Sequence, residues 1–364
     1  MDDSLPIYCP PDVDRGVHPQ VDQVEERAWA MACQSGMGRT ARERARMKAT
    51  SGAQFMSRLA PDAELEAVTV CAAWIYWGFI IDDAYFDGVP PKTTPDRVNE
   101  LTARFQRAFA FPGYVPEEPL GAVLAALGGH FRRQFPPHRL QRLLWRGLDW
   151  YVGLGWGLAN RARQQSFSLD EYMLMRPADA GAQITLGLSE LCVEPEAPAW
   201  EVDTPVVRAL ESLAGAVAAL DNDRQSMHRE KAGGFSSDHV FAVIARERGC
   251  SVADAVPLGI ALRDRLLDRF IELRAAVEAR SVSPGLRQWL RQLACCISGN
   301  AAWGEQVTRY RVGQPGESAA PGLLPVSGRQ FSDKPLNCPE APDPARLPSL
   351  SWIWDDRLLG VRTA

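Results

Sequence analysis

Lysine is scarce in this chain of 364 residues, and no basic segment compensates for its scarcity. Forty Lys and Arg side chains stand against 45 Asp and Glu, which leaves a formal net charge of −5. Nearly all of the basic residues are arginines, and they are mixed with acids along the whole chain. This mixture is not the pattern of a nucleic-acid-binding surface, so we expect no nucleic acid or other polyanion as a partner. The lysines are Lys48, Lys92, Lys231 and Lys334.

Paired or regularly spaced cysteines are also lacking. None of the eight cysteines forms a CxxC pair, and several lie in apolar, helix-type stretches. Such residues are typical of small, reduced core side chains, so we expect no thiolate zinc site. The cysteines are Cys9, Cys33, Cys71, Cys192, Cys250, Cys295, Cys296 and Cys338.

No apolar run is long enough to predict a membrane span. The longest nearly uninterrupted one, residues 67–81, is closed by Glu66 and Asp82, whereas crossing a bilayer takes roughly 18 to 20 apolar residues. The first residues show no basic stretch followed by an apolar one, as a secretory signal would. We therefore expect a soluble, cytoplasmic protein without membrane insertion.

Strand-type alternation is hard to find, whereas apolar residues recur at three- and four-residue spacing between Pro- and Gly-containing breaks. There is no repeat of fixed period and no Pro/Ser-rich linker in the middle. The sequence therefore predicts an all-α protein with an irregular segment at 1–17, one helical domain at 18–313 and a Pro/Gly-rich tail at 314–364. The predicted helices span residues 20–35, 63–82, 118–134, 138–163, 203–231, 235–247, 252–281 and 284–311.

Residues 79–87, "FIIDDAYFD", place three carboxylates directly after an apolar stretch. Acidic side chains are unfavourable at a helix C-terminus, so helix termination alone does not account for them. On an α-helix Asp83 and Asp87 would share a face, while Asp82 would lie offset and beside Phe79. At least two of these carboxylates can converge on one cation. A solvated surface cluster is the alternative.

A second polar stretch, "LDNDRQSMHRE", lies inside a predicted long helix. Asn222, Ser226 and Glu230 are spaced by four residues, which makes one stripe of three oxygen ligands about 12 Å long. An amide, a hydroxyl and a carboxylate suit a hard cation such as Mg²⁺, whose octahedron phosphate oxygens and waters would complete. Asn and Ser are mediocre helix formers, so their place in mid-helix indicates a role other than helix stability.

Large aromatic residues accumulate on faces of the long helices that we expect to point inward. Filling the core would explain any one of them, whereas several together could line a cavity. They are Trp74, Trp77, Phe79, Trp145, Trp150, Tyr151, Trp156 and Trp303.

These motifs together resemble the bacterial class I terpene synthases of the single-domain type. In that family a DDxxD or DDxxxD motif precedes NDxxSxxxE by about 140 residues, which "DDAYFD" and "NDRQSMHRE" match. "HPQVDQVEERAWAMACQSGM" is similar to the family's N-terminal helix, "MRPADAG" to the segment with the diphosphate-sensing arginine, and "WGEQVTRY" to the late Arg-Tyr pair. The resemblance covers about residues 18–312.

The resemblance implies a class I helical bundle around a central apolar active-site cavity. It further implies a Mg²⁺-dependent cyclase that converts a linear isoprenyl diphosphate to a terpene and inorganic diphosphate. Three Mg²⁺ ions are expected, with Mn²⁺ as a substitute. Farnesyl diphosphate is the commonest substrate among similar enzymes, with geranylgeranyl diphosphate as the alternative, and the enzyme would be a monomer or homodimer. The implied residues are Asp82, Asp83, Asp87, Asn222, Ser226 and Glu230 for metal; Arg176, Arg309 and Tyr310 for diphosphate; Asp179 as linker and Ala180 as effector; and Phe55, Trp74, Phe79, Trp303 and Tyr310 facing the carbocation.

Three positions depart from the family pattern. The aspartate motif is one residue longer than the commonest form, Ala180 stands where Gly is common, and Gly78 stands where many relatives have an aromatic residue. Two other functions fit less well. Chain-elongating prenyl diphosphate synthases carry a second DDxxD motif, which the Asn-Ser-Glu stripe replaces here, and a non-catalytic helical scaffold would have no reason to retain the ligand-type residues.

Overall fold

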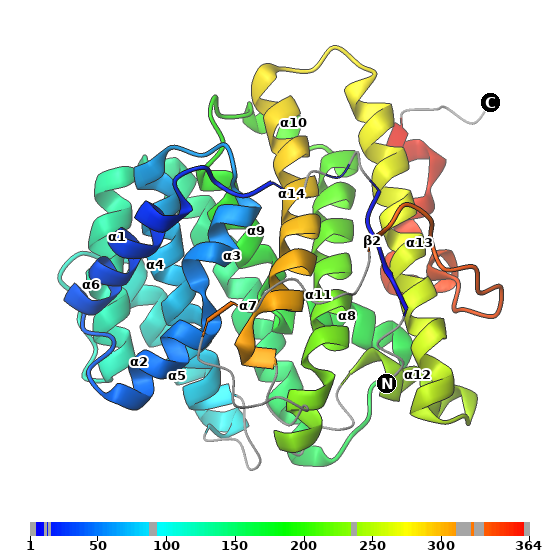
Figure 1. Cartoon of the computed structure of the whole chain (residues 1–364), viewed down its shortest axis with the longest axis horizontal. Coiled ribbons are helices and arrows are strands. Elements are labelled where there is room, and N and C mark those ends of the chain that lie inside the picture. Colours follow the sequence, from blue (N-terminus) through cyan, green and yellow to red (C-terminus); the bar gives the residue numbers. More distant parts are fainter. Residues whose placement is uncertain are drawn as a thin grey trace.

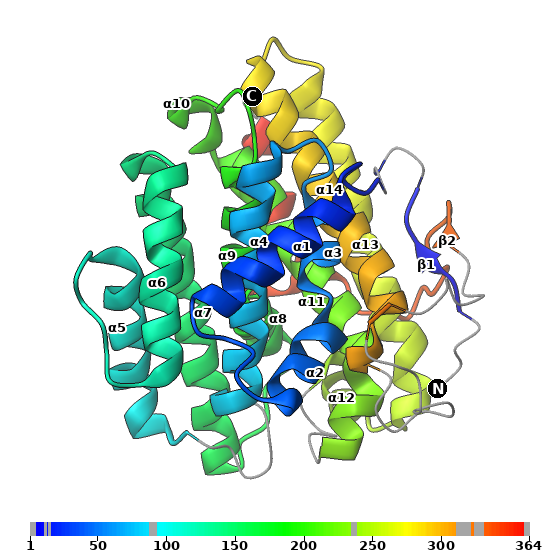
Figure 2. The same ribbon diagram turned by 60° about the vertical axis from the view of Figure 1, so that its left-hand side comes forward.

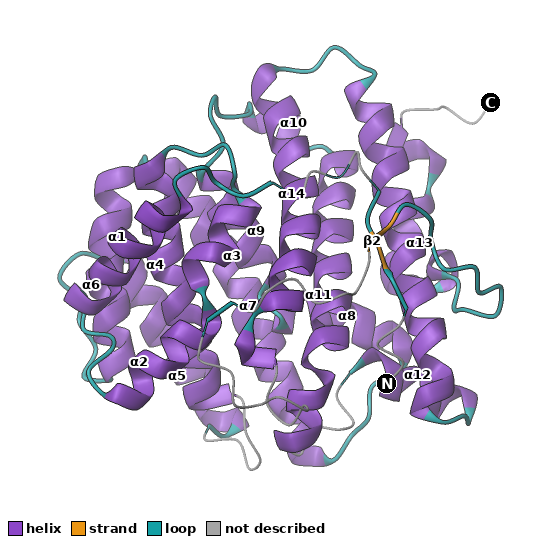
Figure 3. Cartoon of the chain, viewed as in Figure 1, coloured by secondary structure: helices purple, strands orange, loops and turns teal. Residues whose placement is uncertain are grey.

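The computed structural model describes residues 5–10, 13, 16–86, 93–233, 239–310, 322–323 and 331–359. In these ranges helices dominate and β-structure is limited to two short strands and one isolated bridge (Figure 3). The long helices run side by side, with α11 and α14 near the middle and α13 beside them (Figure 1). The predicted all-α class is therefore confirmed.

The α-helices are α1 (Val21–Gln34), α2 (Ala41–Thr50), α3 (Gly52–Leu59), α4 (Leu65–Ile81), α5 (Pro95–Ala110), α6 (Pro119–Gln134), α7 (Pro137–Arg163), α8 (Leu169–Asp179), α9 (Ala182–Leu191), α10 (Ala199–Val202), α11 (Pro205–Gly233), α12 (Val240–Arg248), α13 (Val252–Glu278), α14 (Pro284–Gln306) and α15 (Pro348–Ser351). The shorter elements are the π-helix η1 (Asp82–Phe86), the 3₁₀-helices η2 (Thr308–Tyr310), η3 (Pro344–Arg346), η4 (Trp352–Trp354) and η5 (Asp356–Leu359), and the strands β1 (Ile7–Tyr8) and β2 (Phe331–Ser332).

Local side-chain chemistry explains where several of these helices begin and end. Ser168 and Glu171 form a capping box at the start of α8, and Ser251 and Asp254 form another at the start of α13. Each box satisfies backbone N–H groups that the first turn leaves without a helical partner. Gly249 ends α12 with φ +63°, a left-handed conformation that glycine adopts without steric cost.

Helix α4 is the central core helix. It is apolar around its whole circumference and packs against α1, α3 and α6, as expected for a helix with no solvent-facing side. The stretch Leu65–Phe86 is long and apolar enough to cross a membrane by composition, but 72% of its most apolar window is buried inside the protein. Packing within the fold therefore accounts for its hydrophobicity.

Helix α11 lies between α13 and α14 and is fixed beside them by a buried ion pair. Arg263 of α13 donates from Nε and Nη2 to the two carboxylate oxygens of Asp221, at 2.8 and 2.9 Å. Such a two-pronged pair sets position as well as energy. Asp221 directly precedes Asn222, so this pair also holds the start of the predicted metal stripe in register.

The sequence-based helix predictions missed α2, α3, α5, α8 and α9. Helix α2 is polar almost throughout, with only Met47 and Thr50 buried, so it lacks a clear apolar period. Helices α8 and α9 are short and separated by a break at Gly181. The predicted helix 284–311 was too long. Helix α14 ends at Gln306, Val307 has an extended backbone conformation, and the chain continues in the separate 3₁₀-helix η2.

The terminal segments, predicted to be irregular, contain short elements that pack on the bundle. β1 pairs in parallel with β2 at the edge of the molecule (Figure 2). Arg265 of α13 donates to the carbonyl oxygens of Ala341, Pro342 and Cys338, and Arg269 donates to that of Ile353, which is fully buried. The tail thus packs against α13 through Ile353.

Candidate active site

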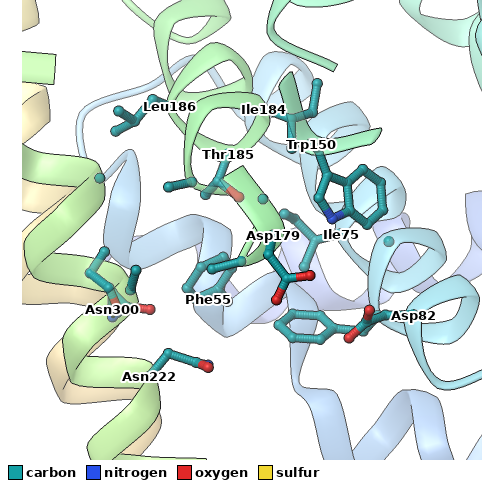
Figure 4. Close-up of a pocket in the computed structure, with 18 of the residues that line it drawn as sticks. Phe55, Ile75, Asp82, Trp150, Asp179, Ile184, Thr185, Leu186, Asn222 and Asn300 are labelled. Carbon is teal, nitrogen blue, oxygen red and sulfur yellow. Dashed lines mark hydrogen bonds between the residues drawn. The ribbon is translucent and has the colours of Figure 1, made fainter. Parts of the chain in front are cut away.

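A cavity of about 1240 Å³, its open mouth included, lies between α3, α4, α7, α9, α11 and α14 (Figure 4). All five aromatic residues predicted to face a carbocation line it. Trp150 of α7 lines it as well, with its ring centroid 5.8 Å from that of Trp74. The rings of Phe55 and Trp303 lie 4.7 Å apart. The predicted aromatic residues in the wall are Phe55, Trp74, Phe79, Trp303 and Tyr310.

One end of this cavity is polar. In Figure 4 the carboxylates of Asp82 and Asp179 and the amide of Asn222 lie toward one end, and the apolar Ile184 and Leu186 lie toward the other. An apolar cavity with hydrogen-bonding and acidic groups at one end suits an amphiphilic ligand that has a charged head group. Arg176 bonds both Asp179 and Asn222, and Tyr310 bonds Asn222, so these two wall residues lie at the same end. Further charged or polar wall residues are Arg161, Ser226 and Arg309.

The aspartate motif does not continue the α-helical period. Residues 82–86 form a π-turn, in which hydrogen bonds run from i to i+5. The prediction that Asp83 and Asp87 share a face assumed α-helical geometry, which the chain does not have at residues 82–86. Asp87 itself lies outside the described residues. Asp82 lines the cavity, whereas Asp83 accepts two hydrogen bonds from the Arg309 guanidinium, at 2.7 and 2.8 Å.

Two members of the Asn-Ser-Glu stripe lie where its spacing predicted. Asn222 and Ser226 both line the cavity from α11. Glu230 belongs to the same helix, but its side chain lies outside the described part of the structure. The amide of Asn222 bridges two predicted diphosphate donors: its Oδ1 accepts from Arg176 Nη2 at 2.7 Å, and its Nδ2 donates to the Tyr310 hydroxyl at 2.6 Å.

Asp223 is a site residue that the sequence analysis did not single out. It is fully buried and accepts hydrogen bonds from Arg176 Nε at 2.7 Å, Tyr172 Oη at 2.7 Å and Val240 N at 2.8 Å. These bonds fix the orientation of the Arg176 guanidinium and connect α8, α11 and α12. Its position inside "LDNDRQS" could have indicated this role, because a charged residue on the buried side of a long helix needs a partner of opposite charge or a hydrogen-bond donor.

The segment "MRPADAG" forms the break between α8 and α9. Ala180 has φ −69°, a right-handed conformation open to any residue, and Gly181 has φ +68°. The substitution of Ala for the commoner Gly at position 180 therefore costs no backbone strain, because the left-handed conformation is adopted by Gly181. Asp179 accepts from Arg176 Nη1 at 3.1 Å, so the break is tied to the same guanidinium.

Trp74 fills the space next to Gly78. A Cβ atom at Gly78 would stand 2.9 Å from Cζ3 of the Trp74 indole. The aromatic residue that many relatives carry at this position is thus replaced by an indole from the preceding turn of α4.

Cys296 lines the cavity from α14. Burial is the main cause that raises the pKa of its thiol to about 12. The thiol therefore stays protonated near neutral pH and is a weak nucleophile.

Helix α7 packs closely against the α8–α9 break at Gly153. At Gly153 a Cβ would stand 2.3 Å from the backbone nitrogen of Asp179 and 2.5 Å from the carbonyl carbon of Ala178. No real Cβ tolerates such contacts, and the atoms it meets are backbone. The absence of a side chain at Gly153 therefore allows the break to lie directly on α7.

We expect Gly153→Ala to lower the free energy of unfolding by about 1–3 kcal/mol, because backbone must shift to admit the methyl group. Gly155→Ala is the matched control: its Cβ would meet only a Val98 methyl at 3.6 Å, and helix propensity should then stabilise the protein by up to about 1 kcal/mol. Urea unfolding followed by circular dichroism measures both. Equal stabilities of the two variants would contradict the close packing at Gly153.

Among the described residues, metal binding at the polar end would use amide and hydroxyl oxygens together with carboxylate oxygens. Within the described residues no group of three or more His, Cys, Asp or Glu side chains could hold an ion. Asp82, Asn222 and Ser226 line the same cavity and offer only oxygen donors, which suits a hard divalent cation that completes its shell with ligand oxygens.

Residues 73–267 match the family described as terpene synthase family 2, C-terminal metal binding. The chain is 35% identical to spiroviolene synthase of Streptomyces violens over 99% of this chain and 98% of that protein. It is 29% identical to phomopsene synthase of Allokutzneria albata over 96% of each chain. A crystal structure of a variant of the SVS_A2 protein from ancestral sequence reconstruction superposes with a TM-score of 0.85, at 34% identity over 98% of this chain and 99% of that one.

Proposed function

The chain belongs to the bacterial class I terpene synthases, and we propose that it binds a linear isoprenyl diphosphate with the head at the polar end of the cavity and the chain along the aromatic wall. Ionisation of the carbon–oxygen bond would release inorganic diphosphate and leave an allylic cation that cyclises inside the cavity. The observation that supports this most directly is the meeting of Asp82, Asn222, Ser226, Arg176 and Arg309 at one end of an apolar cavity.

Divalent-metal dependence comes with the family, and we propose Mg²⁺ as the ion, three per site, with Mn²⁺ as a substitute. The oxygen donors of Asp82, Asn222 and Ser226 fit such ions, and Asp83, Asp87 and Glu230 are the further proposed ligands. When bound, the ions neutralise the diphosphate charge and act as Lewis acids toward the leaving group.

Each proposed diphosphate donor bonds a proposed metal ligand in the structure. Arg176 and Tyr310 bond Asn222, and Arg309 bonds Asp83. An incoming diphosphate would offer acceptor oxygens to Arg176 and Arg309, which would free Asn222 Oδ1 and Asp83 for cations; the Tyr310 hydroxyl, which accepts from Asn222 Nδ2, would donate its own proton to the diphosphate. We propose that this exchange couples head-group binding to closure of the site and orients the arginine forks on the phosphate oxygens.

The aromatic wall would then stabilise the passing carbocation. Ring faces contribute about 0.5–2 kcal/mol each to a desolvated cation, and Phe55, Trp74, Trp150 and Trp303 line the cavity for this purpose. The protonated Cys296 thiol is a poor competitor for the cation. The described residues that line the cavity include no histidine, so we propose that the released diphosphate accepts the final proton.

We propose geranylgeranyl diphosphate as the preferred substrate, in place of the farnesyl diphosphate that the sequence analysis put first, and keep farnesyl diphosphate as the shorter alternative. Small residues form one side of the cavity, which leaves room for a longer chain. Among similar proteins, a Streptomyces relative 28% identical to this chain is named a diterpene cyclase, and a Streptomyces clavuligerus relative 26% identical is named a farnesyl-diphosphate-cyclizing synthase. The small wall residues, all on α11, are Ala214, Gly215, Ala218 and Ala219.

Incubation with C10, C15 and C20 diphosphates and Mg²⁺, followed by gas chromatography and mass spectrometry, tests this proposal. We expect cyclic hydrocarbons or alcohols chiefly from the C20 substrate. Longer diphosphates formed with added isopentenyl diphosphate would indicate a chain-elongating synthase instead. A melting temperature that Mg²⁺ plus diphosphate does not raise, together with no turnover, would favour a non-catalytic scaffold.

Asp82 and Asp87 should differ in importance. We expect Asp82→Asn to reduce turnover far more than Asp87→Asn, because Asp82 faces the cavity directly. Asp87→Asn should mainly broaden the product mixture by loosening closure. Rates and product profiles of the two variants measure this; equal losses, or a dead Asp87→Asn enzyme beside an active Asp82→Asn one, would show that the extra residue in the motif has changed the ligand set.

We also propose that the protein works as a soluble cytoplasmic enzyme, a monomer or homodimer, without a nucleic-acid partner. The burial of α4 inside the fold supports this environment.

A further inference from the structure

The outer face of α7 leaves large apolar side chains exposed. Trp145, Leu148 and Val152 are 65%, 40% and 66% exposed, although the solvent side of a surface helix is ordinarily polar. Leu174 of α8 and Trp352 of η4 are exposed as well, and both line one surface groove together with Trp145. Exposed apolar side chains gathered in one patch indicate an interaction surface.

The exposed residues of α7 belong to a stripe whose spacing is symmetric about Val152. In each direction the stripe continues at four, seven and eleven residues from Val152, and steps of three and four keep all of these positions on one helix face. Every position of this α7 stripe is exposed or half-buried. Toward the N-terminus it contains Leu148, Trp145 and Gln141, and toward the C-terminus Trp156, Ala159 and Arg163.

Symmetric spacing makes the α7 stripe complementary to itself when two copies of α7 run antiparallel. With a two-fold axis at Val152, the bulky Trp145 of each chain would face the small Ala159 of the other. Leu148 would face Trp156, and the two Val152 side chains would meet at the axis. Each large side chain thus opposes a smaller one, which lets two helices pack at the usual axis separation of about 8–10 Å. An isologous contact of this kind closes a dimer with two-fold symmetry.

The charges at the two ends of α7 support the same arrangement. In the first turn, His138 and Arg139 hold the carboxylates of Glu196 and Glu194 at 3.0 and 2.7 Å, and both glutamates remain exposed. The exposed Arg163 lies in the last turn. Antiparallel pairing would bring Arg163 of each chain to the end of α7 that carries the two glutamates in the other, and such charge complementarity favours this partner and this orientation.

We propose that the α7 stripe is the two-fold interface of a homodimer, in which α7 of one chain packs antiparallel against α7 of a second copy. A second copy is the partner that fits, because the size pattern and the end charges of α7 match α7 itself. The inference goes beyond the proposed function and does not depend on it.

Val152→Arg tests the interface at its axis, where two like charges would face each other. Sedimentation equilibrium over about 1–100 µM protein gives the Kd of the dimer. We expect wild type to reach twice the chain mass of 40.1 kDa, and Val152→Arg to raise the Kd at least about 100-fold, because like charges that meet in an interface are strongly unfavourable.

Val252→Arg is the control for a general effect of the added charge. Val252 is also exposed and begins α13. Helices α12 and α13 lie on the opposite side of the molecule from α5, against which α7 packs (Figures 1 and 2). We expect this variant to change the Kd less than about twofold.

Exchange of a large and a small residue tests the antiparallel register. Ala159→Trp alone would bring two indoles into the space of one, and it should raise the Kd at least about tenfold. Trp145→Ala combined with Ala159→Trp restores one large and one small side chain at each contact, and it should return the Kd to within about threefold of wild type. Melting curves by circular dichroism report whether each variant is folded.

Wild-type protein that stays monomeric over this range would overturn the proposal and leave the α7 stripe to a partner of another kind. A dimer that Val152→Arg leaves intact would place the interface on another face and overturn it as well. Dissociation without recovery in the double variant would refute the antiparallel register. Val152 does not line the cavity, so turnover is a separate measurement, and its absence in wild type would contradict the proposed function alone.

Discussion

Asn222→Ala is expected to reduce product formation by about 10²- to 10³-fold or more, the range seen when one preorganised polar group is removed from a charged transition state. Asn222 faces the cavity and bonds both Arg176 and Tyr310. Its loss would remove a proposed metal ligand and also release two diphosphate donors. Turnover by chromatography and the Mg²⁺-dependent thermal shift with diphosphate both measure the effect.

Asn300→Ala is the matched control for that variant. Asn300 also lines the cavity, but its amide donates to the carbonyl oxygen of Ala218 at 3.2 Å rather than to a diphosphate donor. We expect it to keep the Mg²⁺-dependent thermal shift. Both variants should retain helical circular dichroism. Wild-type turnover by Asn222→Ala would refute the metal assignment of the Asn-Ser-Glu stripe.

Arg176→Lys should lose most activity although it keeps the charge. The guanidinium uses Nε, Nη1 and Nη2 for three different partners, Asp223, Asp179 and Asn222. A lysine has one nitrogen for these three acceptors, and an unsatisfied buried acceptor such as Asp223 costs about 1–3 kcal/mol or more. We therefore expect a lower melting temperature, a loss of kcat of about 10²-fold or more, and little rescue by higher substrate concentration.

Arg208→Lys controls for a general effect of the exchange. Arg208 is exposed and pairs with the exposed Asp203 through a single contact of 2.8 Å, and such surface pairs contribute little to stability. We expect its melting temperature and kinetics to match wild type. Unchanged kinetics in Arg176→Lys would mean that the likeness of "MRPADAG" to the family's sensor segment is accidental.

The polar motifs and the apolar wall were predictable because they depend on spacing along one helix. Asn222 and Ser226 share a face of α11 as the four-residue spacing requires. The aromatic residues Phe55, Trp74, Phe79 and Trp303 line one cavity. Helical periodicity predicts which residues share a face, and a pattern match to a family adds which faces turn inward.

Contacts between helices could not be obtained in this way. Asp223 meets Tyr172 and Val240 from two other elements, and Asp179 approaches α7 at Gly157, where a Cβ would stand 3.2 Å from its Oδ1. The hydrophobic period of a helix shows which of its own residues share a face, and it does not show which residues of a neighbouring helix they contact. Helix α2 was missed for a different reason: its few buried residues produce a hydrophobic period that is too weak to detect.

The amino-acid sequence by itself determined the all-α class, the central apolar helix and the order of the polar motifs, because hydrophobic period and side-chain chemistry are local properties. Tertiary structure alone decided the partner of Asp83. A π-turn at residues 82–86 changes the helical period, and Arg309 of η2 holds Asp83 while Asp82 lines the cavity. The packing of the tail on α13 was likewise beyond the sequence, because its carbonyl groups meet their arginine donors only when residues 73 to 84 positions apart come together in space.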